Sequence, residues 1–288
     1  MEALLSTSFD NLSSYDQMKI RKGLRQVEGL LAQICLSPST AVNRRSKNDM
    51  EKERPPKKRL EELVHDPAFR EFFKLQDGFE WNVALRLVNT LDRLLSKSQG
   101  GQNDLLVIQT LDLIQGVLML HPSSRTLFSR ELNMNHLLDL LEPINCPAIQ
   151  SATIITLVCA LIETPQNTRT FENLDGLFIC TSLFKSRETS REVKLKLVEF
   201  LYFYLMPEFP CVPPNSKTSA PELLKRNPSK LGGNLERNDA NEREDIKDKV
   251  EFTRSIEEKQ ALLGRYLNSV DDLVADLRES APFEGVSV

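Results

Sequence analysis

Three stretches of similar pattern decide the fold: LLVIQTLDLIQGVLMLHP at 105–122, AIQSATIITLVCALIETP at 148–165 and REVKLKLVEFLYFYLMP at 191–207. Each is a helical run rich in apolar residues that ends at a proline, and the three prolines lie 43 and 42 residues apart. A period in the low forties with two or three helices per unit is typical of armadillo or HEAT repeats. Because one such unit cannot bury its apolar face alone, neighbouring units stack on a continuous core. The sequence therefore predicts an all-α, armadillo/HEAT-like helical repeat solenoid.

Shorter apolar runs at 132–141 and 174–184 lie between the long ones. The order of short helix, turn and long helix resembles the second and third helices of an armadillo repeat. The phrases HPSSRTLF at 121–128 and TPQNTRTF at 164–171 also match, and they place Arg125 and Arg169 in corresponding positions. Two interpretations of this arginine pair stay open. The side chains contact a partner, or they hydrogen-bond carbonyls at the end of a neighbouring helix and fix the turn between repeats.

Further helices are predicted on the N-terminal side of these runs. Residues 1–36 carry apolar side chains at helical spacing and are predicted to form the N-terminal helices of the solenoid, while 63–207 form the repeats. Within the repeats, Asp66-Pro67 is a strong helix start, with Asp as N-cap and Pro in the first helical position.

Two segments are predicted to be disordered, because they hold too little apolar surface to offset the entropy of ordering. The first, 37–62, is a basic insert with eight Lys/Arg against three acids over 43–59. The second, 208–252, is rich in proline and then in mixed charge. After it, 253–280 is predicted to form a C-terminal amphipathic helix, with Ser255 and Glu258 as a capping box.

Composition excludes several classes of protein. A net charge of −4 and a pI near 5.6 argue against a nucleic-acid binder, whose footprint is a basic surface. No apolar stretch approaches the roughly 20 residues that a membrane span needs. The N-terminus lacks the basic and apolar regions of a signal peptide. Five cysteines without framework spacing suit a reducing compartment, so a cytoplasmic protein is predicted.

No constellation of catalytic, metal-binding or cofactor-binding residues is present in the sequence. The three histidines, at 65, 121 and 136, lack metal-ligand spacing and are interpreted as capping or surface groups. A cysteine phosphatase needs an arginine six residues after its thiolate, and none of the five cysteines has one. Phosphate loops and nucleophile elbows are also absent. We therefore expect no enzyme activity and no cofactor, and the sequence does not set the oligomeric state.

One aromatic cluster, Phe200–Tyr204, makes the third long run apolar on all sides. Such a helix is buried on every side or exposes an adhesive face, and both interpretations stay open. If the helix exposes such a face, Tyr202 and Phe203 anchor a protein partner there, while Lys196 and Glu199 set specificity.

Several long phrases carry a family resemblance: Met1–Cys35, Asp66–Trp81, Ser186–Glu208 and the tail from Glu257 to Pro282. Over nearly the whole chain they are similar to the fungal cell division control protein 14 family of the septation initiation network. An unrelated dual-specificity phosphatase shares that name, and the missing arginine excludes it. The resemblance implies a non-catalytic subunit that binds a germinal-centre-type protein kinase and supports septum formation and cytokinesis. It also implies association with the spindle pole body.

An alternative function comes from Pro-Pro-Lys-Lys-Arg at 55–59, which is typical of a nuclear-localisation signal. Together with a solenoid, this motif suggests an adaptor for nuclear transport or for another protein partner. A solvated loop between helices explains the same residues without a function.

Overall fold

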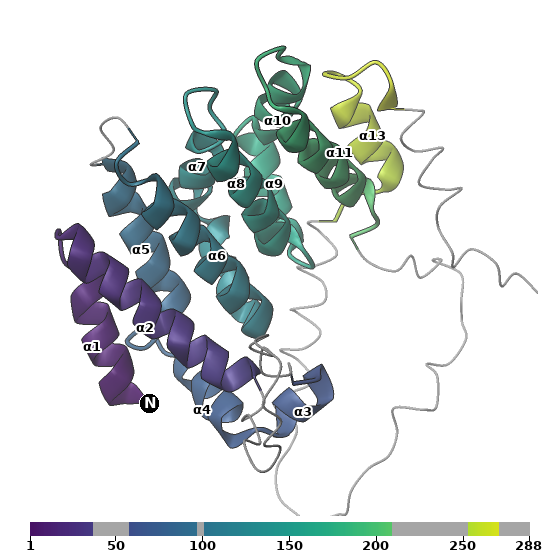
Figure 1. Ribbon diagram of the computed structural model, residues 1–288. Coiled ribbons are helices and arrows are strands. Elements are labelled where there is room, and N and C mark those ends of the chain that lie inside the picture. Colours follow the sequence, from purple (N-terminus) through teal and green to yellow (C-terminus); the bar gives the residue numbers. More distant parts are fainter. Residues whose placement is uncertain (37–57, 97–100, 209–252, 271–288) are drawn as a thin grey trace, which may run out of the picture.

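The computed structural model describes residues 1–36, 58–96, 101–208 and 253–270, and each regular element in these ranges is a helix (Figure 1). The all-α class is thereby confirmed. The elements are α1 (Glu2–Leu12), α2 (Gln17–Cys35), α3 (Leu60–His65), α4 (Pro67–Gln76), α5 (Val83–Ser96), α6 (Asp104–Leu120), the 3-10 helix η1 (Pro122–Ser129), α7 (Glu131–Asp139), α8 (Pro147–Leu161), α9 (Pro165–Asn173), α10 (Gly176–Lys185), α11 (Arg191–Leu205) and α13 (Ile256–Leu263).

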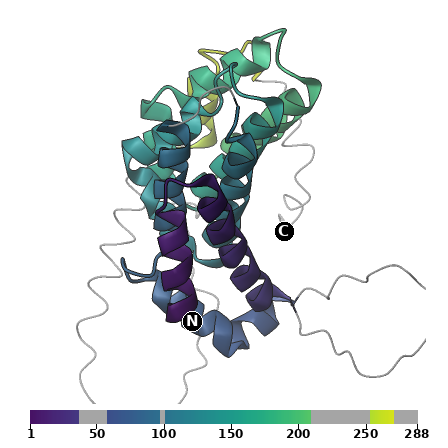
Figure 2. The same cartoon turned by 60° about the vertical axis from the view of Figure 1, so that its left-hand side comes forward.

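The helices stack in chain order in two layers. One layer holds the long helices: α6 packs between α2 and α8, and α11 packs between α8 and α13. The other layer holds the shorter elements, with α1 against α5, α5 against η1 and α7, and α9 against η1, α7 and α10. Figures 1 and 2 show this progression from α1 and α2, in purple at one end, to α13, in yellow at the other.

A single apolar core runs through the stack, from Leu5 in α1 to Val270 after α13. Burying each large aliphatic or aromatic side chain stabilises the fold by about 1.5–3 kcal/mol. Helices α5, α6 and α8 each bury seven apolar residues, because neighbouring helices pack against each of them on several sides. Stacking, rather than any one unit, therefore holds the fold together.

Proline and capping residues place the helix boundaries much as the sequence predicts. Pro122 and Pro165 open η1 and α9 directly after α6 and α8, so each later unit contains three helical elements. Asp66 accepts from the Ala68 amide, and Ser190 accepts from the Val193 amide. Whether the repeats are of the armadillo or the HEAT type stays a prediction.

Ser14 and Gln17, three residues apart, predict a capping box at the start of α2, and the structure differs from that prediction. Asp16 is the N-cap, and its carboxylate accepts from the Met18 amide at 2.9 Å, while the Ser14 hydroxyl accepts from the Asp16 amide. Gln17, the expected capping-box partner, instead donates to Asn103 Oδ1 at 2.8 Å. The Gln17 side chain therefore contacts the start of α6 and does not complete a capping box with Ser14.

The predicted inserts fall largely outside the described residues. For 37–62 the structure describes only 58–62, where α3 begins at Leu60, and for 208–252 it describes only Glu208. The predicted C-terminal helix is described to Val270, with α13 ending at Leu263. In these described parts of the chain, no helix is long and apolar enough to cross a membrane.

Candidate partner-binding surface

The long helices leave one side of their layer uncovered. Each of α6, α8 and α11 has neighbouring long helices or α13 on its flanks and the shorter helices beneath it. The exposed side chains on the remaining side include large apolar residues. We call this surface the long-helix face and define it by Leu105, Met119, Ile155 and Leu195, whose relative exposures lie between 40% and 74%. Exposed apolar residues on one continuous face are a feature of protein-interaction sites.

The sequence-predicted residues of α11 divide between this face and the interior. Glu199 is exposed, and its carboxylate pairs with the Lys196 ammonium one turn earlier at 2.8 Å. Tyr202 is half-buried. Phe203 is half-buried as well, with its ring 6.2 Å from that of buried Phe200. The aromatic cluster is therefore core on one side and surface on the other.

Arg125 fixes a turn between two units. Its side chain is buried, and Nη1 donates to the Ile162 carbonyl at 3.1 Å and to Glu163 Oε2 at 3.2 Å, both just beyond the end of α8. Glu163 has φ 54°, a left-handed conformation that a non-glycine residue adopts at a cost. The arginine satisfies a carbonyl at this irregular helix end, as the structural interpretation predicts.

Arg169 reaches the equivalent place one unit later but binds acids instead of carbonyls. Nη2 donates to Glu208 Oε1 at 2.6 Å, just after α11, and lies 3.0 Å from Glu172 Oε1. The two arginines are not in identical positions: Arg125 lies three residues after its proline and Arg169 four. Because η1 is a 3-10 helix and α9 an α-helix, both offsets amount to about one turn.

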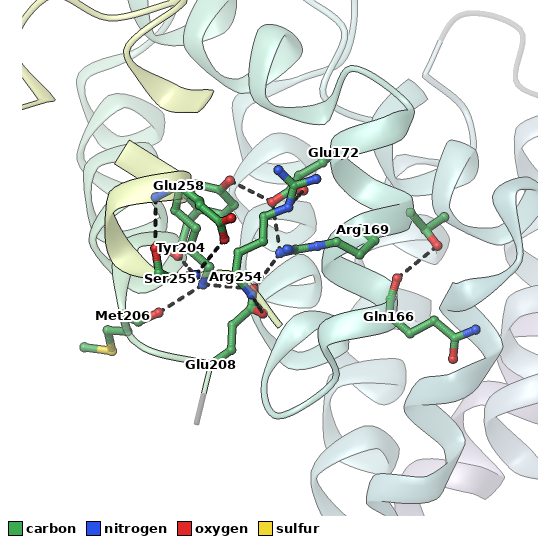
Figure 3. A network of polar contacts seen from close by, with 11 residues as sticks. Gln166, Arg169, Glu172, Tyr204, Met206, Glu208, Arg254, Ser255 and Glu258 are labelled. Carbon is green, nitrogen blue, oxygen red and sulfur yellow. Dashed lines mark hydrogen bonds and ion pairs between the residues drawn. The ribbon is translucent and has the colours of Figure 1, made fainter. Parts of the chain in front are cut away.

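Glu208 joins the stack to the tail (Figure 3). Its Oε1 binds Arg169 and also Lys259 Nζ at 3.0 Å, while its Oε2 accepts from the Arg254 backbone amide at 3.0 Å. Lys259 is buried and donates further to the carbonyls of Tyr204, at 2.9 Å, and Met206, at 3.0 Å. A lysine from the tail thus satisfies the carbonyls at the end of α11.

Glu172 is the second carboxylate of this cluster. Its Oε1 accepts from the Tyr204 hydroxyl at 2.8 Å, and its Oε2 lies 3.2 Å from Arg254 Nε. We call Arg169, Glu172, Glu208, Arg254 and Lys259 the charged junction. Three cations and two carboxylates meet there.

Burial dominates the electrostatics of the charged junction. It raises the pKa of Glu172, against the opposing effect of the Arg169 charge and the Tyr204 hydrogen bond. Burial, with the nearby Glu172 charge, raises the pKa of the Tyr204 phenol. Burial lowers the pKa of Lys259, against the attraction of Glu208. Each shift disfavours the charged form, which is the expected consequence of removing charge from water.

The tail docks on its own chain. Leu263, Leu267 and Val270 are buried, and α13 packs on α11. The capping box predicted at its start is confirmed, since Ser255 and Glu258 exchange hydrogen bonds with each other's backbone amides. Figure 3 shows Ser255 and Glu258 beside the charged junction.

His121 makes a buried polar contact that the sequence does not predict. The sequence predicts a capping or surface group, and His121 does stand at the C-cap of α6 and the N-cap of η1, but its ring is buried and contacts Asp77 at 3.0 Å and Ser124 at 2.8 Å. It links the α4–α5 loop to the next unit. The local signal was its place directly before Pro122, at a helix end that needs polar partners.

The described residues hold no group of three or more His, Cys, Asp or Glu that could bind a metal ion. The four cysteines in these ranges are free thiols. Burial raises the pKa of the Cys180 thiol to about 12, so this sulfur is a small apolar core group rather than a nucleophile.

The fold and this surface define an all-α protein of stacked helices whose candidate site is a face rather than a catalytic cleft. The family model described as "Cell division control protein 14, SIN component" matches residues 1–283, so the chain belongs to that family. The protein is a component of the septation initiation network, in a family that supports cytokinesis, and not the phosphatase of the same name.

A curated relative agrees. The chain is 28% identical over 293 residues to "Cell division control protein 14" of Schizosaccharomyces pombe, with 98% of this chain and 97% of the relative covered. No solved structure matches the chain.

Proposed function

We propose that this protein is a non-catalytic scaffold that binds a germinal-centre-type protein kinase and supports its activity in septum formation and cytokinesis. We propose further that it acts in the cytoplasm and at the spindle pole body. Membership of the septation initiation network family supports a role in this process. The long-helix face is the observation that carries the binding role.

The long-helix face exposes both apolar and charged side chains to a partner. Leu105, Ile155 and Leu195 are apolar groups that a partner can desolvate, and such anchors supply most of the free energy of association. Glu199 and Lys196 lie at the α11 end of the face and are exposed enough to select a partner of complementary charge. Arg125 and Arg169 are buried in turn contacts, so we assign them to the stability of the stack instead.

The test is capture of the purified kinase by the full chain carrying Leu195→Asp. A carboxylate in the middle of a desolvated apolar contact should weaken binding by about tenfold or more. The matched control is Leu132→Asp on α7, where a leucine of 68% exposure lies outside the long-helix face. Far-UV circular dichroism and thermal melting check that both variants fold.

Loss of capture with Leu195→Asp alone supports the proposal. Equal capture by both variants, or equal loss from both, would contradict the assignment of this face. Tyr202→Ala and Phe203→Ala refine the boundary. The first should weaken binding with little change in melting, and the second should lower the melting temperature because its ring packs on Phe200.

A further inference from the structure

The exposed side of α2 carries four cations that have no acidic partner in the part of the chain that the structure describes. Lys19, Arg21, Lys22 and Arg25 are all exposed. Among the described residues, no carboxylate lies within ion-pair distance of any of them. We call them the α2 cations. Like charges stand three or four residues apart in the pairs Lys19/Lys22, Lys22/Arg25 and Arg21/Arg25, a spacing at which they repel each other on the helix surface. Asp16 and Glu28 lie at the same spacing only at the two ends of this group. A chain of net charge −4 thus keeps a locally repulsive basic surface.

The α2 cations adjoin the long-helix face. Two hydrogen bonds hold α2 beside α6, Gln17 to Asn103 at 2.8 Å and Gln109 to Glu28 at 3.3 Å. The α2 cations lie between these two contacts on α2, as does exposed Leu105 on α6. The basic surface therefore continues the apolar one at its α2 end.

A hollow of about 500 Å³ lies between the start of α2 and the end of α5 and includes Met18, Arg93 and Asn103. Met18 also lies on the side of α2 that carries the α2 cations, and it is largely exposed. An occupant of this surface meets cations and apolar groups together.

The same face carries acidic residues further along. Glu28 follows the α2 cations, and Asp112 on α6 has a pKa raised by partial burial and by the charge of Glu28. A lipid bilayer with anionic headgroups presents one sign of charge throughout, so these carboxylates would repel it. A polypeptide can vary its charge residue by residue. The charge pattern therefore favours a protein partner over a membrane.

We propose that the α2 cations bind an acidic, amphipathic segment of a partner protein, whose apolar side chains contact Met18 and Leu105. The carboxylates of that segment pair with the guanidinium and ammonium groups of α2. This inference rests on the proposed function and extends the kinase-binding face from α6, α8 and α11 to α2.

The test compares two triple charge reversals in the full chain. Arg21→Glu, Lys22→Glu and Arg25→Glu remove the basic surface. The control reverses Arg130, Arg187 and Arg265, three exposed cations outside α2, α6, α8 and α11 that also lack an ion pair in the described structure. Affinity for the purified kinase is measured against NaCl concentration. Vesicles containing phosphatidylserine provide a second probe, by co-sedimentation.

We expect the α2 reversal to weaken kinase binding by about tenfold or more at low salt, and the control to bind as wild type does. Wild-type binding should also weaken as salt rises, and the α2 reversal should lose most of that dependence. If the α2 reversal is poorly folded by circular dichroism, the glutamine triple variant replaces it, with the same expectation in direction.

Other outcomes separate the two proposals. Full kinase binding by the α2 reversal, with loss from Leu195→Asp, overturns this inference and leaves the proposed function in place. Full binding by both overturns both. Vesicle binding that needs the α2 cations, with kinase binding unchanged, makes the surface a lipid site and overturns the protein partner.

Discussion

The turns after α8 and after α11 each receive an arginine from the preceding unit, but the acidic partner of that arginine is exposed at the first turn and buried at the second. In each, an arginine one turn after a proline reaches the end of the next long helix. After α8 its acidic partner, Glu163, is 77% exposed, whereas after α11 its partner, Glu208, is 7% exposed. The tail makes the difference, because Arg254 and Lys259 cover Glu208 where the next repeat would otherwise stand.

This difference shows where the repeat ends. At the turn inside the stack, one arginine satisfies the end of α8, and the carboxylate of Glu163 stays exposed to solvent. At the last unit the tail covers the charged junction and excludes solvent from it. Each charge there therefore needs a charged or polar partner from the protein. A buried cluster of this kind is strongly destabilised when one member is removed, although it adds little stability compared with an apolar contact.

The largest effect should follow from removing the buried carboxylate. Glu208→Ala leaves Arg169 and Lys259 short of a partner and should lower the free energy of unfolding by about 3–5 kcal/mol. Glu163→Ala, the matched change at the exposed turn, should cost less than about 1 kcal/mol. Urea denaturation followed by circular dichroism measures both. Similar losses in the two variants would mean that the two turns do not differ energetically.

The sequence predicts the local parts of these two turns well. Helices α6, α8 and α11 end within a few residues of Pro122, Pro165 and Pro207, because proline is not tolerated in the interior of a helix. The caps at Asp66, Ser190 and Ser255 are likewise set by neighbouring residues.

The charged junction could not be predicted in the same way. It pairs Glu208 with Lys259, 51 residues later, and periodicity reports which side of a helix is apolar but not which polar groups meet on it. One signal was present: Lys259 lies one turn before Leu263 and so continues the buried stripe of α13. Similarly, the apolar run of α11 did not reveal which of its aromatic residues face the interior.

A smaller effect is expected from the tail side of the junction. Lys259→Met keeps an apolar stem that can fill the site but leaves Glu208 with one cation fewer and two carbonyls without their donor. We expect a loss of about 2–3 kcal/mol and faster hydrogen exchange in residues 253–270.

The control for this change is Lys185→Met, whose exposed ammonium donates to a single group among the described residues, the Tyr266 carbonyl. In the Lys185→Met variant, the amide hydrogen-exchange rates of residues 253–270 should stay close to those of wild type. Slow exchange of 253–270 in both variants would show that apolar contacts alone hold the tail.

The smallest effect is a dependence on pH. Because burial raises the pKa of Glu172, the folded state favours its protonated form, and the stability gained from that preference is lost as pH rises through the folded-state pKa. Glu172→Gln mimics the protonated carboxyl, so it should gain stability relative to wild type as pH rises above about 4.5. Glu163→Gln, at the exposed turn, is the matched control variant. Urea melts over this range measure both, and a trend of opposite sign would contradict the dominance of burial.

Hydroxyl-radical footprinting of the full chain, with and without kinase, is the most direct test of the proposal that the long-helix face binds the kinase. We expect the kinase to protect Leu105, Met119, Ile155 and Leu195, all exposed in the free protein. We expect no change at Leu132 and Phe178, which are exposed on the other layer. Protection of Leu132 and Phe178 with unchanged oxidation of the long-helix face would contradict it.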